Sequence, residues 1–201
     1  MKYIFDFDDV LFNNTSQFKP HMYEVLVDAG VPLDEARAYY EEKRKKEFSL
    51  RKFITTLFSR HDEIKNNVEE TYQEIMRECS NFINTQLLEA VRRIGRENCY
   101  IVTYGDKEFQ RDKIKYSGIF NLFDKNKIYP VTESKTETIK KICKENAVHE
   151  VVFIDDKMPH IKGVEEDINK KDYPNLTTIH YKDFESLMRE KGVVSELKGP
   201  R

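Results

Sequence analysis

The sequence predicts an α/β protein in which a parallel sheet covered by helices carries an inserted helical bundle. Short runs of β-branched and aromatic residues recur along the chain, and stretches with helical patterning separate the later ones. Strands that alternate with helices in this way form parallel sheets with both faces covered. An insert is indicated because roughly 90 residues separate the first run from the second, far more than one crossover requires.

The expected strands are short and apolar. The first stops abruptly at acidic residues, which is typical of a buried strand that delivers carboxylates from its C-terminal end. We expect strands at residues 3–7, 100–103, 151–154 and 176–179, with a weaker candidate at 127–129. Helices are expected at residues 84–93, capped near Gly95, at 107–116, ended by Gly118, and at 134–145. The prediction is a Rossmann-like parallel sheet whose ligands bind beyond the carboxyl ends of its strands.

The interval between the first two strands reads as a small helical bundle. Apolar residues recur there at mixed three and four spacing in residues 17–29, 33–47, 50–58 and 64–79. We therefore place a helical cap domain at residues 14–82, hinged around Asn13-Asn14 and near Phe82, and an α/β core at residues 1–13 and 83–201. The tail from residue 192 is expected to be frayed.

Composition excludes several classes of function. The chain has 201 residues with 34 Lys+Arg against 36 Asp+Glu, so no overall charge attracts nucleic acid or an anionic membrane. No apolar run approaches the roughly 20 residues that span a bilayer, and no signal peptide is expected. The three cysteines are far apart and are interpreted as reduced thiols, which favours the cytoplasm.

Two pairs of acids follow expected strands. Asp6 and Asp8 stand at alternate positions where the first strand ends, so both side chains project into one crevice. Two close carboxylates repel unless a cation neutralises them or one stays protonated, and both options suit phosphoryl chemistry. Asp155 and Asp156 repeat the design and could supply further oxygen ligands to the same cation. The alternative is that these acids cap a following turn or helix.

Hydroxyl, amide and ammonium groups at neighbouring strand ends could hold a phosphate. Thr103 ends one strand, and the backbone around Tyr104 and Gly105 offers amides suited to phosphate oxygens. Lys135 opens a later helix, where its ammonium could reach a phosphate. Each signal is weak alone, and Thr103 could be an ordinary strand residue. The order and spacing of all of them together indicate a phosphoryl-transfer site.

This arrangement resembles the haloacid dehalogenase-like (HAD) superfamily, whose four motifs match residues 6–10, Thr103, Lys135 and the pair Asp155-Asp156 in the same order. The resemblance covers residues 3–179, and the insert is similar to the helical C1 cap of subfamily I. It implies that Asp6 is a nucleophile forming an aspartyl-phosphate, and that Asp8 protonates the leaving oxygen and then activates water.

The resemblance also implies a phosphate and metal site. Thr103 and Lys135 would hold the phosphoryl oxygens. Mg²⁺ would be bound by the Asp6 carboxylate, the Asp8 main-chain carbonyl and Asp156, with Asp155 either a further ligand or an acid that supports the ligands. Asp8 favours a phosphatase, because dehalogenases of the family lack an acid there.

Three residues depart from the family pattern. Val10 replaces the commoner Thr of the first motif, and Thr136 follows Lys135 where many relatives have Pro. His160 stands where relatives often carry Asp or Asn, and it either orients an acid or simply begins the next helix.

We therefore expect a Mg²⁺-dependent phosphatase acting on a phosphomonoester of a small metabolite, a sugar phosphate or a nucleotide. Alternatives are a phosphomutase, which hands the phosphoryl group to another hydroxyl, and a binding or regulatory module that retains the fold without turnover. Expected partners are a small phosphorylated substrate, with no membrane and no nucleic acid. The basic run at residues 43–46 is interpreted as a solvated helix face, and Phe48, Phe53 and Phe58 as core residues of the cap.

Overall fold

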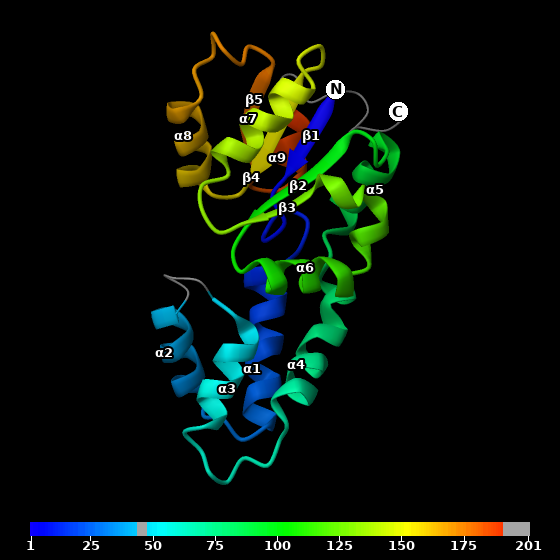
Figure 1. Ribbon diagram of the computed structural model, residues 1–201. Helices are drawn as coiled ribbons and strands as arrows, with labels where there is room; N and C mark the ends of the chain where they lie inside the picture. The colour runs from blue at the N-terminus through cyan, green and yellow to red at the C-terminus, as the bar shows by residue number, and fades with distance from the viewer. Residues whose placement is uncertain (44–47, 191–201) are drawn as a thin grey trace.

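The computed structural model describes residues 1–43 and 48–190 and contains a parallel sheet of five strands in the order β3-β2-β1-β4-β5 (Figure 1). The strands are β1 Lys2–Phe5, β2 Cys99–Tyr104, β3 Ile128–Val131, β4 Val151–Asp155 and β5 Leu176–His180. All the expected strands are present, and the predicted α/β fold class is confirmed. β1 ends at Phe5, so Asp6 is the first residue beyond it.

Helices cover both faces of this sheet. They are α5 Thr85–Ile94, α6 Lys107–Tyr116, α7 Thr136–Glu145, α8 Met158–Asp167 and α9 Phe184–Arg189, with short 3₁₀ turns at Ile119–Leu122 and Lys125–Lys127. Alternate residues of β1 belong to two different hydrophobic clusters, because successive strand side chains point to opposite faces. Tyr3 and Phe5 share a cluster with residues of α5, α6 and α9, whereas Ile4 packs with residues of α7 and α8.

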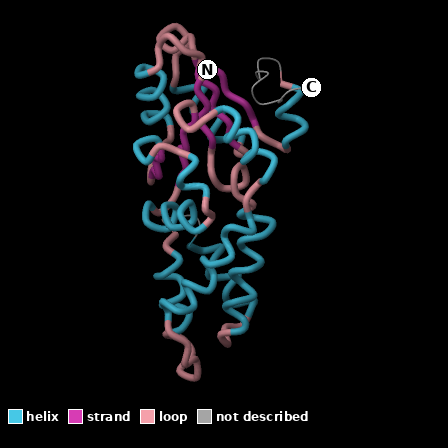
Figure 2. The backbone as a smooth tube through the Cα atoms, turned by 90° about the vertical axis from the view of Figure 1, so that its right-hand side faces the viewer, coloured by secondary structure: helices cyan, strands magenta, loops and turns pink. Residues whose placement is uncertain are grey.

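The chain between β1 and α5 folds into helices beyond the carboxyl ends of the strands. They are a π-helical turn η1 Asn14–Phe18, α1 Lys19–Asp28, α2 Leu33–Lys43, α3 Leu50–Phe58, α4 Val68–Arg77 and a 3₁₀ turn η2 Glu78–Phe82. Figure 2 shows these helices as a separate group below the strands. We call them the insert. Its boundaries as a domain, residues 14–82, stay a prediction.

The predicted helices agree with the structure to within a few residues. α6 has the predicted bounds, and α7 begins two residues later than expected, at Thr136. α4 begins only at Val68 because the Asn67 side chain accepts hydrogen bonds from the amides of Glu69 and Glu70 and so caps it. Residues 44–46 of the basic run and the tail predicted to fray lie outside the described residues. No helix in the described ranges is long and apolar enough to span a membrane.

The two connections between insert and sheet lie side by side. The Asn13 amide donates to the Phe82 carbonyl at 2.7 Å, and the Asn84 amide donates to the Leu11 carbonyl at 2.9 Å. These pairs bring the predicted hinge segments into contact. The chain turns sharply between Phe7 and Phe12, just before the first connection, and Asp9 in this turn has a positive φ of 61°. Asn, Asp and Gly are the residues that adopt that conformation most readily.

Candidate active site

A buried ion network stands where β1 and β4 end. Pairing of Phe5 with Ile154 sets the two strands side by side, so the acids that follow them meet at one edge. The Asp6 Oδ1 oxygen accepts a hydrogen bond from the Phe7 amide at 2.7 Å and lies 2.8 Å from Lys135 Nζ. Lys135 Nζ also lies 2.6 Å from Asp155 Oδ2. Lys135 therefore bridges the two acid pairs that the sequence predicts to meet.

Asp155 is fully buried and hydrogen-bonded on both oxygens. Its Oδ1 accepts from the Lys157 amide at 2.8 Å, and His160 Nδ1 lies 3.1 Å from its Oδ2. Burial alone would raise the pKa of Asp155, but the His160 hydrogen bond and the Lys135 charge outweigh it and lower that pKa. His160 lies in the first turn of α8 and contacts an acid, which agrees with the first of its two alternatives, that it orients an acid.

Asp156 differs from its neighbour in the surroundings of its carboxylate. Its Oδ1 is buried without a hydrogen bond to any described residue. Burial raises the pKa of Asp156 to about 6, and the charges of Asp6, Asp155 and Asp9 add to the rise while Lys157 opposes it. A buried oxygen without a partner costs free energy, and a bound cation would remove that cost. Ligand atoms of Asp6, Asp155 and His160 also lie within 4.8 Å of one another. The residues present therefore fit a divalent cation.

Asp8 is held by two residues of α6 that sequence reasoning missed. Lys113 Nζ lies 2.5 Å from Asp8 Oδ1, and Gln110 Nε2 donates to Asp8 Oδ2 at 2.9 Å. The Lys113 side chain is only 1% exposed. Phenylalanine rings surround its ammonium, with centroids between 4.8 and 5.8 Å away: Phe7, Phe12, Phe18 and Phe109. Burial would raise the pKa of Asp8, but the charge and hydrogen bond of Lys113 lower it overall.

The residues predicted to bind phosphate have different surroundings. Thr103 is buried and its hydroxyl oxygen has no partner among the described residues, whereas Tyr104 is half exposed with its ring 6.2 Å from that of His160. The Gly105 amide donates to the Val131 carbonyl at 2.8 Å, so in this structure it is not available to a phosphate. A Cβ at Gly105 would lie 2.9 Å from Gln110 Nε2, which indicates that the glycine makes room for the side chain that holds Asp8.

A cavity of about 560 Å³ lies between the sheet and the insert. The core lines it with Asp8, Asp156, Lys113 and Lys157, and the insert with Phe18, Met22, Tyr40 and Phe48. Phe48 and Phe53 pack with Tyr40 in the insert, and Phe58 contacts the same hydrophobic cluster, as expected of cap core residues. Phe48 also lines the cavity, and its ring centroid lies 5.8 Å from that of Phe109.

Comparison with known proteins identifies the fold. The sequence matches no protein-family model and no curated protein. Solved structures match well, the first a protein assigned as a haloacid dehalogenase-like hydrolase from Burkholderia xenovorans, with a TM-score of 0.66 at 16% identity over 88% of this chain and 79% of that one. The class defined by fold and strand-end acids is therefore the HAD-like fold, as the sequence motifs predict.

Two further solved structures are similar to this chain. A protein assigned as a beta-phosphoglucomutase from Thermotoga maritima is similar over 98% of this chain and 91% of that one, with a TM-score of 0.54 and 16% identity. A protein assigned as a HAD-hydrolase from Bacillus subtilis, whose structure contains magnesium, has a TM-score of 0.51 and 17% identity over 88% and 84% of the two chains. At such identities these similarities establish the shared fold.

Proposed function

We propose that this chain is a Mg²⁺-dependent phosphatase of the HAD superfamily, which hydrolyses a phosphomonoester of a small metabolite through an aspartyl-phosphate on Asp6. The observation that carries the proposal is the state of the Asp6 carboxylate. One of its oxygens is fixed by the Phe7 amide and Lys135, and the other has no hydrogen-bond partner in the described part of the chain. A carboxylate fixed at one oxygen presents the other as a nucleophile of defined direction.

The proposed reaction has two steps. In the first, an Asp6 oxygen bonds to phosphorus while the bond to the leaving oxygen breaks, and Asp8 gives that oxygen a proton. In the second, water attacks the phosphorus, Asp8 takes the proton of the water, and the bond to Asp6 breaks. Lys113 and Gln110 stabilise the ionised form of Asp8, which favours its part as the base in the second step and opposes its part as the acid in the first.

Phosphoryl oxygens would be bound by Lys135 and by the Thr103 hydroxyl. Lys135 is held between Asp6 and Asp155, so its position is fixed before substrate arrives. The Thr103 hydroxyl is buried on β2, the strand beside β1, without a partner in residues 1–43 and 48–190, and a phosphoryl oxygen would supply one. Lys157 is a further cation lining the cavity. Lys135 and Lys157 would supply positive charge to the transferring group, and Thr103 a hydrogen bond.

A Mg²⁺ ion would be held by Asp6, Asp156 and the main-chain carbonyl of Asp8, with Asp155 fixed beside it by Lys135 and His160. When bound, the ion supplies positive charge that offsets the repulsion between carboxylates and phosphate. Burial raises the pKa of Asp6. The charge of Lys135 offsets part of this rise, and the charge of Asp155 adds to it. A nearby cation would lower the pKa of Asp6 and so favour the ionised nucleophile.

Hydrolysis of p-nitrophenyl phosphate tests the proposal, measured with Mg²⁺ and with EDTA. Activity with Mg²⁺ that EDTA removes and Asp6→Asn abolishes is expected. Asp34→Asn is the matched control, since Asp34 lies exposed in α2 away from the cavity. No turnover of any ester in a panel of sugar phosphates and nucleoside monophosphates would contradict the proposal and favour the binding module.

A phosphomutase is the second candidate, favoured by the similarity to the Thermotoga maritima protein along almost the whole chain. The two activities differ in product. ³¹P NMR of the reaction with a sugar 1-phosphate shows inorganic phosphate for a phosphatase and an isomeric phosphate ester for a mutase.

A further inference from the structure

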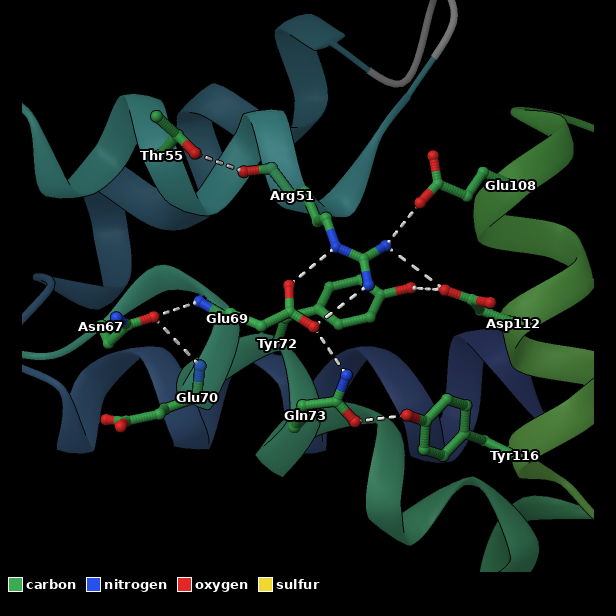
Figure 3. Close-up of polar contacts among 10 residues, drawn as sticks. All are labelled: Arg51, Thr55, Asn67, Glu69, Glu70, Tyr72, Gln73, Glu108, Asp112 and Tyr116. Carbon is green, nitrogen blue, oxygen red and sulfur yellow. Dashed lines mark hydrogen bonds and ion pairs between the residues drawn. The ribbon is translucent and has the colours of Figure 1, made fainter.

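We propose that Arg51 is a positioning residue that docks the insert on α6 and thereby fixes the cavity in which the leaving group binds. This inference rests on the proposed function for its kinetic consequences. Its structural basis is independent of that function, and so is one arm of its test. Arg51 with Glu69, Tyr72, Glu108 and Asp112 is called the Arg51 clasp (Figure 3).

The Arg51 guanidinium joins three helices. Its Nε and Nη2 atoms contact the two carboxylate oxygens of Glu69 on α4 at 2.9 and 3.2 Å, a bidentate pair within the insert. Its Nη1 atom donates to Glu108 Oε1 at 2.9 Å and lies 3.3 Å from Asp112 Oδ2, and both of these acids belong to α6. One side chain therefore ties α3 and α4 to the helix that follows β2.

Tyr72 makes the clasp more than a surface ion pair. The guanidinium carbon lies 3.6 Å from the centroid of the buried Tyr72 ring, and the Tyr72 hydroxyl donates to Asp112 at 2.5 Å. Tyr116 of α6 adds a hydrogen bond to Gln73 of α4. The Arg51 side chain is 33% exposed. Its contacts with Glu69 and the Tyr72 ring lie within the insert, so they orient the guanidinium independently of α6. Fixed, planar, partly desolvated contacts contribute more than two mobile surface charges do.

The other side of α6 carries the groups that hold Asp8. Gln110 and Lys113 contact the Asp8 carboxylate, while Phe109 meets Phe48 of the insert. The Arg51 clasp and the cavity wall are thus attached to the same helix. Without Arg51, Tyr72 and Tyr116 still tie α4 to α6, but α3 loses its ion pairs to α6, and the neighbouring insert wall at Phe48 can move away from Asp8. Substrates whose leaving groups contact that wall would then bind less tightly.

The kinetic arm compares Arg51→Ala with Arg60→Ala. Arg60 is the matched control because it pairs with Glu35 at 3.1 Å and stacks on Tyr39, both within the insert. We expect Arg51→Ala to raise KM for the best substrate of the metabolite panel up to about fivefold, the upper end of what a partly exposed ion pair contributes. kcat toward acetyl phosphate, whose leaving group is too small to reach the insert wall, should stay within about twofold. Arg51→Lys keeps the charge without the fork and should fall between.

The second arm needs no activity and uses a native cysteine as reporter. Cys79 is buried in η2, which packs against α6, and Lys113 and Asp8 are near enough for their charges to act on its thiol. Cys99 of β2 and Cys143 of α7 are buried and serve as references. Iodoacetamide labelling read by mass spectrometry should be about fivefold faster at Cys79 in Arg51→Ala, with Arg60→Ala unchanged.

The outcomes separate the two proposals. Faster labelling of Cys79 alone supports the Arg51 clasp even if every phosphate ester proves inert, in which case only the proposed function fails. Equal labelling in Arg51→Ala and the parent protein overturns the clasp, and so does a parallel rise at all three cysteines, because that indicates general loss of stability. An identical KM in Arg51→Ala and Arg60→Ala for an active enzyme also overturns it.

Discussion

Replacing Asp8 with asparagine should destabilise the protein as well as impair turnover. Asp8 is the only hydrogen-bond partner of the Lys113 ammonium within residues 1–43 and 48–190, and Lys113 is 1% exposed. Removing one member of a buried ion pair leaves the other charge buried without compensation, which commonly costs about 3–5 kcal/mol. Asp8 itself is 14% exposed, so we expect the lower end, about 3 kcal/mol.

Asp6 provides the contrast. It also pairs with a buried lysine, but Lys135 keeps Asp155 at 2.6 Å when Asp6 is neutralised. Asp6→Asn should therefore cost much less stability than Asp8→Asn. The double variant Asp8→Asn/Lys113→Met should recover most of the loss, because it removes the stranded charge together with its partner.

Urea denaturation at pH 7, without added metal, measures these differences. In a chain of this size, about 3 kcal/mol corresponds to a melting temperature lower by roughly 6–12 °C. The reasoning is refuted if Asp8→Asn loses less than about 1 kcal/mol, or if the double variant is no more stable than Asp8→Asn alone.

Three further predictions concern the site and the insert. Asp6→Asn should lower kcat for p-nitrophenyl phosphate by about 10³-fold or more, and residual activity within about tenfold of the parent would contradict its role as nucleophile. Mg²⁺ should raise the melting temperature of the parent protein, and Asp156→Asn should remove most of that rise in a thermal-shift titration, with Asp34→Asn as control. His61 should stabilise the insert below its unfolded pKa, near 6.5, because the Glu35 hydrogen bond, assisted by Glu63, raises its folded pKa. That stability is lost as pH rises through the folded pKa, so unfolding curves of His61→Gln should lack this pH dependence, and an unchanged slope would count against it.

The sequence alone predicted the parallel sheet and the proximity of Asp6 and Asp155 at its carboxyl edge. Apolar runs that end in acids place Asp6 and Asp155 at adjacent strand ends whenever the strands are parallel neighbours. The bounds of α6 were predictable because Asp106 caps its first turn and Gly118 follows its last. These features are local in the chain, or follow from the general rule that ligands lie at the carboxyl edge of a parallel sheet.

The contacts of Asp8 could not be predicted, because they join residues more than a hundred positions apart. A signal was nevertheless present in α6, where Gln110 and Lys113 share a helix face with Phe109. A polar residue on an apolar face needs a partner, although only the fold shows that the partner is Asp8. Gly105 illustrates the same limit, since its amide suited a phosphate in sequence and is bonded to Val131 in the structure.

Helix α6 explains why an insert of aromatic and charged residues can affect a reaction at strand ends. Its charged side carries Glu108 and Asp112, which receive Arg51, and its cavity side carries Gln110 and Lys113, which fix Asp8. A helix is stiff over a length of three turns, so a change of docking on one side changes the surroundings of the other. Substitutions on the charged side should therefore alter substrate preference, whereas substitutions on the cavity side should alter the proton transfer itself.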